Sequence, residues 1–105
     1  MICCSFVFEP GEYDQEFYEL DSEIDEYARS LDGFIKTERW QTKNGAFINS
    51  MYFFENQQSV RELANYPQHQ VAKKNYARWY KSFRVEIMEI SGSYKSNPAP
   101  ELERD

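Results

Sequence analysis

His69 is the only histidine in the chain and the side chain best suited to move a proton near neutral pH. A neutral imidazole can accept a proton from a phenolic substrate, and it can also ligate a haem iron. His69 opens the segment 69–87, HQVAKKNYARWYKSFRVEI, in which a helical pattern passes into a strand pattern. The alternative is a histidine that packs or caps a helix beside Pro67, since no carboxylate is paired with it in the sequence.

Large rings are frequent enough to wall a flat binding pocket. The chain has eight Phe, eight Tyr and two Trp, and the rings that could line such a pocket are Trp40, Tyr52, Phe54, Tyr66, Trp79 and Tyr80. Arg39 and Ser50 are expected as polar neighbours on the same face as Tyr52 and Phe54. The alternatives are that the rings form core or a subunit interface, and that Arg39 and Ser50 are an exposed cross-strand pair.

Two adjacent cysteines, Cys3 and Cys4, are the remaining candidates for metal or redox chemistry. Neighbouring residues of a strand point to opposite faces, so a disulfide between them would be strained. A zinc site would need a second pair of Cys or His ligands, and the chain has one His. We therefore predict buried strand cysteines, no metal site, and a reducing, cytoplasmic location.

Charge and hydropathy limit the partners. A net charge of −6 and a pI of about 4.8 disfavour phosphate backbones and anionic lipid surfaces, so we expect neither nucleic acid nor membrane as a partner. No apolar run approaches the ~20 residues of a membrane span, and the first residues lack the basic region of a signal peptide.

The elements that position these residues follow from the hydrophobic periodicity. It predicts strands over residues 2–8, 34–42, 46–55 and 80–90, and helices over residues 14–31, 56–64 and 67–79. Asp14 and Asn56 are expected to cap the first two helices. The order β-α-β-β-α-β is that of a ferredoxin-like α+β domain, with the helices on one face of an antiparallel sheet. Residues 1–92 are expected to form this domain, and residues 93–105 a flexible C-terminal tail.

The two central strands are predicted to form a hairpin. Asn44-Gly45 is typical of a two-residue type I′ turn, and this register places Arg39 opposite Ser50. Large apolar residues then occupy both faces of the hairpin, whereas one helix layer covers one face. We expect a second subunit to cover the other face, which would also bury the excess of aromatic surface.

With these elements in order, the chain resembles the antibiotic biosynthesis monooxygenase domain family over nearly its whole length except the tail. Residues 31–34, LDGF, are similar to the family's Pro-Gly-Phe turn from helix to strand. Residues 50–56, SMYFFEN, stand where the family commonly has an aromatic-Trp-Glu-Ser run. His69, the basic helix after it and residues 79–85, WYKSFRV, resemble the family's histidine, basic helix and Trp-Tyr-x-x-Tyr/Phe-Arg-x strand.

The resemblance implies a homodimer of the dimeric α+β barrel type, with a pocket between each subunit's helices and its own sheet. Some members of the family oxidise polycyclic aromatic substrates with molecular oxygen and no cofactor. Others bind and cleave haem with a histidine on the second helical segment, an Asn on the first strand and a Trp at the end of the third strand. Here His69 matches the histidine, Phe54 stands at the Trp position, and the polar residue of the first strand is Ser5.

These observations support three hypotheses of function. The first is a homodimeric, cofactor-independent monooxygenase acting on a small aromatic molecule or quinol, with His69 as the catalytic base. Its substrate-binding residues would be Arg39, Ser50, Tyr52, Phe54, Tyr66 and Trp79. The second is a haem-binding or haem-degrading protein in which His69 is the axial ligand. The third is a non-enzymatic dimeric ligand-binding module whose own rings fill the pocket.

Overall fold

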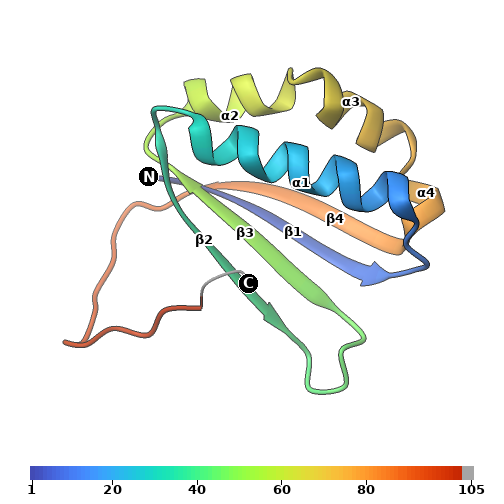
Figure 1. Ribbon diagram of the computed structural model, residues 1–105. Coiled ribbons are helices and arrows are strands. Elements are labelled where there is room, and N and C mark those ends of the chain that lie inside the picture. Colours follow the sequence, from blue (N-terminus) through green and yellow to red (C-terminus); the bar gives the residue numbers. More distant parts are fainter. Residues whose placement is uncertain (103–105) are drawn as a thin grey trace.

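The computed structural model describes residues 1–102, which form one open sheet with helices on one of its faces (Figure 1). Along the chain the elements are β1 (Ile2–Pro10), α1 (Gln15–Ser30), β2 (Phe34–Gln41), β3 (Ile48–Phe54), α2 (Gln57–Ala64), α3 (Pro67–Lys74), α4 (Tyr76–Trp79) and β4 (Tyr80–Glu89). The strands are antiparallel in the order β2-β3-β1-β4. This topology confirms the predicted ferredoxin-like α+β fold.

Both predicted helix caps are present. The Asp14 carboxylate accepts a hydrogen bond from the Phe17 N–H at 2.9 Å, and the Asn56 side chain accepts one from the Ser59 N–H at 3.1 Å. Each bond satisfies an N–H group that the first turn of a helix leaves without an intrahelical partner. The caps therefore fix where α1 and α2 begin.

The helix predicted over residues 67–79 is instead two helices, α3 and α4. Asn75 lies between them with φ −113° and ψ 9°, outside the helical region. Its side chain donates to the Val71 carbonyl at 2.8 Å and accepts from the Arg78 guanidinium at 3.1 Å. An asparagine side chain that bonds nearby backbone groups competes with the helical ladder, which explains the break.

The β2–β3 hairpin has the predicted register from Lys36 to Gln41, but the register shifts between Phe34 and Lys36, and the turn is different. The Thr42 N–H donates to the Phe47 carbonyl at 2.9 Å, and the Gly45 N–H donates to the Thr42 carbonyl at 2.8 Å. A type I′ turn needs positive φ at Asn44 as well as at Gly45, and only Gly45 has it among the described residues (φ 73°). The predicted type I′ turn was therefore wrong. A four-residue loop over 43–46 closes the hairpin, and the register is kept because this loop is centred on the predicted turn.

The main core lies between the sheet and the helices at one end of the strands. Ile2 and Phe54 of the sheet pack against Ala28 of α1 and against Val60 and Leu63 of α2, and all are buried. Burying a large apolar side chain of this kind contributes about 1.5–3 kcal/mol. This cluster holds α1 and α2 on the sheet, while the space toward the other end of the strands is filled less completely.

The opposite face of the sheet carries no helix (Figure 1). The pairing register directs a mixed set of side chains to it, among them Cys3, Val7, Trp40, Met51 and Met88. Trp40 and Met88 are 44% and 43% exposed. The Ser5 hydroxyl also lies on this face, where it donates to the Asn49 side chain at 3.0 Å.

After β4 the described chain has no helix or strand, and it returns beside the free edge of β2 (Figure 1). There the Arg39 N–H donates to the Leu102 carbonyl at 2.6 Å. The predicted tail over 93–105 is described as far as Leu102; residues 103–105 lie outside the described residues, and the tail's flexibility stays a prediction. Within residues 1–102 no helix is both long and apolar enough to cross a membrane.

Candidate functional site

A cavity of about 560 Å³ lies between the helix layer and the sheet, beside the main core. Its size falls within the range of about 300–1,000 Å³ that is typical of small-molecule sites. Much of its wall is aromatic, and the rings include those of Phe6, Phe8, Phe17, Tyr76, Trp79 and Tyr80. The Phe6 ring lies 5.1 Å from that of Tyr80 and 5.8 Å from that of Tyr76, so these rings support one another around the space.

One side of the cavity is open along β4. Phe83, Val85 and Ile87 line it, and they are 47%, 52% and 54% exposed. These residues project from the edge strand toward the helix side of the sheet but are not covered there. A ligand therefore has an apolar opening through which to reach the rings.

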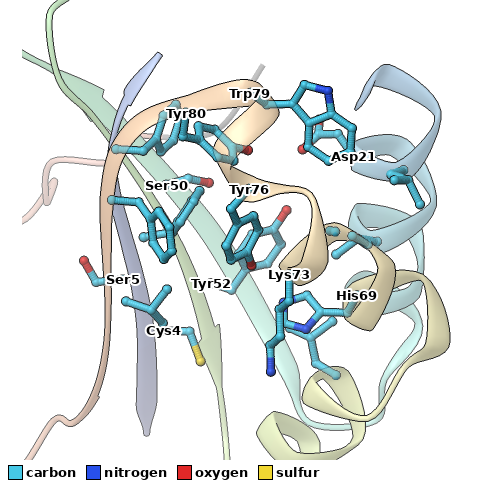
Figure 2. Close-up of a pocket in the computed structure, with 18 of the residues that line it drawn as sticks. Cys4, Ser5, Asp21, Ser50, Tyr52, His69, Lys73, Tyr76, Trp79 and Tyr80 are labelled. Atoms are coloured by element: carbon cyan, nitrogen blue, oxygen red, sulfur yellow. The ribbon is translucent and has the colours of Figure 1, made fainter. Parts of the chain in front are cut away.

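His69 lies on α3 at the lower end of the cavity in Figure 2. Its Nδ1 is buried and has no hydrogen-bond partner among the described residues. In the neutral ring one nitrogen carries the proton and the other keeps a free lone pair.

The surroundings of His69 keep the ring neutral. Burial lowers the pKa of His69 below its ordinary value of 6.5, and the nearby Lys73 ammonium lowers it further, although the Ala64 hydrogen bond acts in the opposite direction. Lys73 stands one helical turn after His69 and also lines the cavity. A neutral imidazole with a free lone pair can accept a proton at pH 7.

Arg39 and Ser50 lie directly opposite each other on β2 and β3, and both line the cavity. The guanidinium carbon of Arg39 is 5.9 Å from the centre of the Phe8 ring, a cation–π distance. Ser50 is buried, with 6% of its surface exposed. The two residues form a polar part of an otherwise apolar floor.

Tyr52 and Trp79 line the cavity, as predicted. Each side chain is held by a carboxylate on α1 or next to it. The Tyr52 hydroxyl donates to Asp25 at 2.6 Å, and the Trp79 indole N–H donates to Asp14 at 3.1 Å. Asp14 also accepts from the Arg78 guanidinium at 2.8 Å, so α4 is tied to the start of α1. Hydrogen bonds of this kind fix the position of a ring as well as its plane.

Phe54 and Tyr66 do not line the cavity, and we correct their assignment as substrate-binding residues. Phe54 is fully buried in the main core, with its ring 6.1 Å from that of Phe34. It points to the helix side of the sheet as expected, but the end of β3 lies beneath the core cluster. Tyr66 is in the connection before α3, and its ring stacks on that of Tyr27 at 3.9 Å, away from the cavity.

Tyr76 and Lys73 belong to the site, although sequence reasoning did not select them. Figure 2 shows Tyr76 at the centre of the cavity, with Lys73 and His69 below it. Burial raises the pKa of Tyr76, so its hydroxyl stays protonated at neutral pH. The spacing of His69, Lys73 and Tyr76 is helical and could have indicated a common face.

The cysteines and the acidic groups of residues 1–102 are further candidates for metal ligands or nucleophiles. Cys4 lines the cavity, and its burial raises the pKa of the thiol to about 11, so it is not a thiolate at neutral pH. Cys3 and Cys4 are both free. In residues 1–102 no group of three His, Cys, Asp or Glu side chains is placed to hold a metal ion.

Comparison with known proteins identifies the fold. No protein-family model and no curated protein matches the chain. SnoaB, a cofactor-independent oxygenase from Streptomyces nogalater, superimposes with a TM-score of 0.68 at 8% identity, over 88% of this chain and 94% of SnoaB. A proposed antibiotic biosynthesis monooxygenase from Deinococcus radiodurans gives 0.69 at 10% identity, over 91% of this chain and 98% of that one.

The chain shares the fold of these two proteins. A conserved protein from Methanosarcina mazei shares this fold, with a TM-score of 0.66 at 16% identity over 83% of this chain and 89% of that one. Identities this low show the fold alone, so the reaction has to be argued from the residues around the cavity.

Proposed function

We propose that this protein is a cofactor-independent monooxygenase that oxidises a small aromatic quinol, with His69 as its general base. The observation that supports this best is the placement of His69, whose Nδ1 has no hydrogen-bond partner among the described residues, in the wall of an aromatic cavity. Its lowered pKa leaves the base in its active, neutral form at pH 7. The shared fold with a cofactor-independent oxygenase agrees with this reaction class.

The chemistry requires an electron-rich anion. The His69 imidazole takes the proton from a quinol hydroxyl, and the resulting anion reacts with molecular oxygen. A quinol and O₂ then give a hydroxyquinone and water, so the substrate itself supplies the electrons that reduce oxygen. The apolar walls disfavour water around the anion, which raises its reactivity.

Replacing His69 tests the role of the base. We expect His69→Ala and His69→Gln to lower oxygen uptake by about 100-fold or more, since a positioned general base contributes about 10²–10⁴-fold. A panel of quinols should be screened in an oxygen electrode, and the circular dichroism of each variant should match the wild type. Lys74→Ala, on the same helix but outside the cavity lining, is the matched control and should keep full activity. Unchanged turnover in both His69 variants would contradict the proposed role.

Haem binding is the second candidate, because an unpartnered imidazole nitrogen could also ligate iron. The other residues do not fit that use. The Ser5 hydroxyl bonds Asn49 on the opposite face of the sheet, and Phe54 lies in the core rather than at the cavity. We expect haemin titration to give no Soret shift that depends on His69. A saturable shift that His69→Ala removes would replace the oxygenase proposal.

We further propose that the protein is a homodimer that pairs through the helix-free face of its sheet. The exposure of Trp40 and Met88 on that face supports this arrangement. A passive dimeric binding module would share the interface and the cavity. It would bind aromatic ligands without oxygen uptake, so the quinol screen also separates these two functions.

A further inference from the structure

We propose that the ligand of the cavity carries an acidic group, such as a carboxylate, and that Arg39 and Ser50 form the subsite that binds it. This inference rests on the proposed function only in taking the cavity as the ligand site. It does not depend on whether the ligand is oxidised. It gives a binding role to a part of the cavity wall that takes no part in proton transfer by His69.

The first observation is that the Arg39 guanidinium has no anionic partner within residues 1–102. Arg29, Arg78 and Arg84 each bind a carboxylate at 2.8 Å, whereas Arg39 forms no ion pair in this part of the chain. The chain has 18 acidic and 12 basic residues, so carboxylates are in excess. A half-buried guanidinium with no ion-pair partner among residues 1–102 is available to an anion of a ligand.

The second observation is the placement of Ser50 beside Arg39. Ser50 is the cross-strand partner of Arg39, and it lines the cavity with 6% of its surface exposed. Guanidinium N–H groups can bind both oxygens of a carboxylate, and a hydroxyl can add a third hydrogen bond. The Phe8 ring below the guanidinium holds it toward the cavity.

One carboxylate of the protein shares this part of the wall. Asp21 lines the cavity, and the charges of Arg39 and Asp21 act in opposite directions on the pKa of Tyr13. Asp21 has interactions of its own. Its negative charge opposes a ligand anion, so the acidic group of the ligand has to contact the Arg39 guanidinium directly.

The third observation is the separation of the two polar ends. In the view of Figure 2, Ser50 lies on the sheet and His69 and Lys73 lie on α3, with Tyr76 between them. A ligand that uses both ends needs an ionisable hydroxyl at one end of a flat ring system and an acidic group at the other. A bicyclic hydroxy acid has this form.

Calorimetric titration under argon tests the subsite without turnover. The probes are a hydroxynaphthoate with hydroxyl and carboxylate at opposite ends of the ring pair, and the matching hydroxynaphthamide. We expect the wild type to bind the acid at least about tenfold more tightly than the amide, a difference of about 1.4 kcal/mol. Arg39→Gln should remove this preference and change the affinity for the amide by less than about twofold.

Three further variants make the test specific. Arg84→Gln, on the opposite face of the sheet, is the matched control and should keep the full preference. Ser50→Ala should reduce the preference by about threefold, and it replaces Arg39→Gln if that variant does not fold. Lys73→Gln tests whether the other cation of the cavity wall binds the acid instead, in which case this variant and not Arg39→Gln would lose the preference.

Equal binding of acid and amide to the wild type would overturn the proposal, as would a preference lost in Lys73→Gln but kept in Arg39→Gln. Absence of binding by both probes would overturn it as well. Binding of the acid that depends on Arg39, together with no oxygen uptake on any quinol, would support the subsite and contradict the oxygenase function alone.

Discussion

The imidazole of His69 is the group whose chemistry depends most on its surroundings. Burial and the charge of Lys73 both oppose its protonation. A surface histidine would be partly protonated near pH 6.5 and would lose its activity as a base there. His69 stays neutral to a lower pH, so its imidazole can still accept a proton throughout the physiological pH range.

The pH dependence of turnover should follow from this shift. We expect oxygen uptake to be constant from pH 8 to about 6.5 and to fall only at lower pH, as His69 becomes protonated below its ordinary pKa. Because the chain has a single histidine, one imidazole resonance followed by NMR reports its pKa without assignment. A pKa above 6.5 would contradict the described surroundings of the ring. A Lys73→Gln variant should raise the pKa, because it removes a neighbouring positive charge.

Single residues of the site were predictable to different degrees. His69, Arg39, Ser50, Tyr52 and Trp79 all line the cavity, and the strand register correctly paired Arg39 with Ser50. Alternation along a strand indicates the face to which a side chain points but not its distance from the core. That is why the sequence could not separate a ring at the end of β3 from a ring of the cavity wall.

At the scale of elements, the close approach of the β1–α1 loop to α4 positions one wall of the cavity. The Gly11 N–H donates to the Trp79 carbonyl at 2.8 Å. A Cβ atom on Gly11 would stand 2.7 Å from that same carbonyl oxygen, which belongs to the backbone and cannot rotate away. Glycine is required here because the two chain segments touch.

Gly11→Ala should therefore destabilise the fold. We expect a loss of about 1–3 kcal/mol in the free energy of unfolding, as for other overpacked sites, measured by urea unfolding at one protein concentration. Gly92→Ala is the matched control, because a Cβ atom there meets nothing within 4 Å, and it should change the free energy by less than about 0.5 kcal/mol. Equal stability of the two variants would contradict the close contact.

The elements themselves were largely predictable because their signals are local. Alternation, helical periodicity and the caps at Asp14 and Asn56 each depend on a few neighbouring residues. The break at Asn75 and the loop at Gly45 were missed for a different reason. At Asn75 the hydrogen bonds of one side chain decide the conformation, and at Gly45 a single φ angle decides it. The residue types at these positions allow more than one conformation.

At the scale of the whole molecule, the sheet has a covered face and a face without helices. Small domains bury a limited share of their surface, and association is the usual way to cover apolar groups that remain. The proposed homodimer would bury Met88 of β4 and Trp40 of β2 at its interface.

Two substitutions at equally exposed positions test this interface. Met88 on the open sheet face and Val71 on α3 are both 43% exposed in the single chain. We expect the wild type and Val71→Glu to sediment at twice the chain mass of 12.6 kDa, and Met88→Glu to sediment as the single chain. A carboxylate buried at an interface without a partner is strongly unfavourable, whereas one on a free helix surface is not. A wild type that sediments at 12.6 kDa would contradict the homodimer.

The unequal environments of the two tryptophans give the protein an internal optical probe. Trp79 is 2% exposed and lines the cavity, while Trp40 is 44% exposed on the far face of the sheet. A buried indole emits fluorescence at shorter wavelength than one in water, so the spectrum of the native chain is a sum of two separable bands. Filling the cavity should change the short-wavelength band, and covering the sheet should shift the other toward the blue. One emission spectrum can thus record ligand occupancy and association independently.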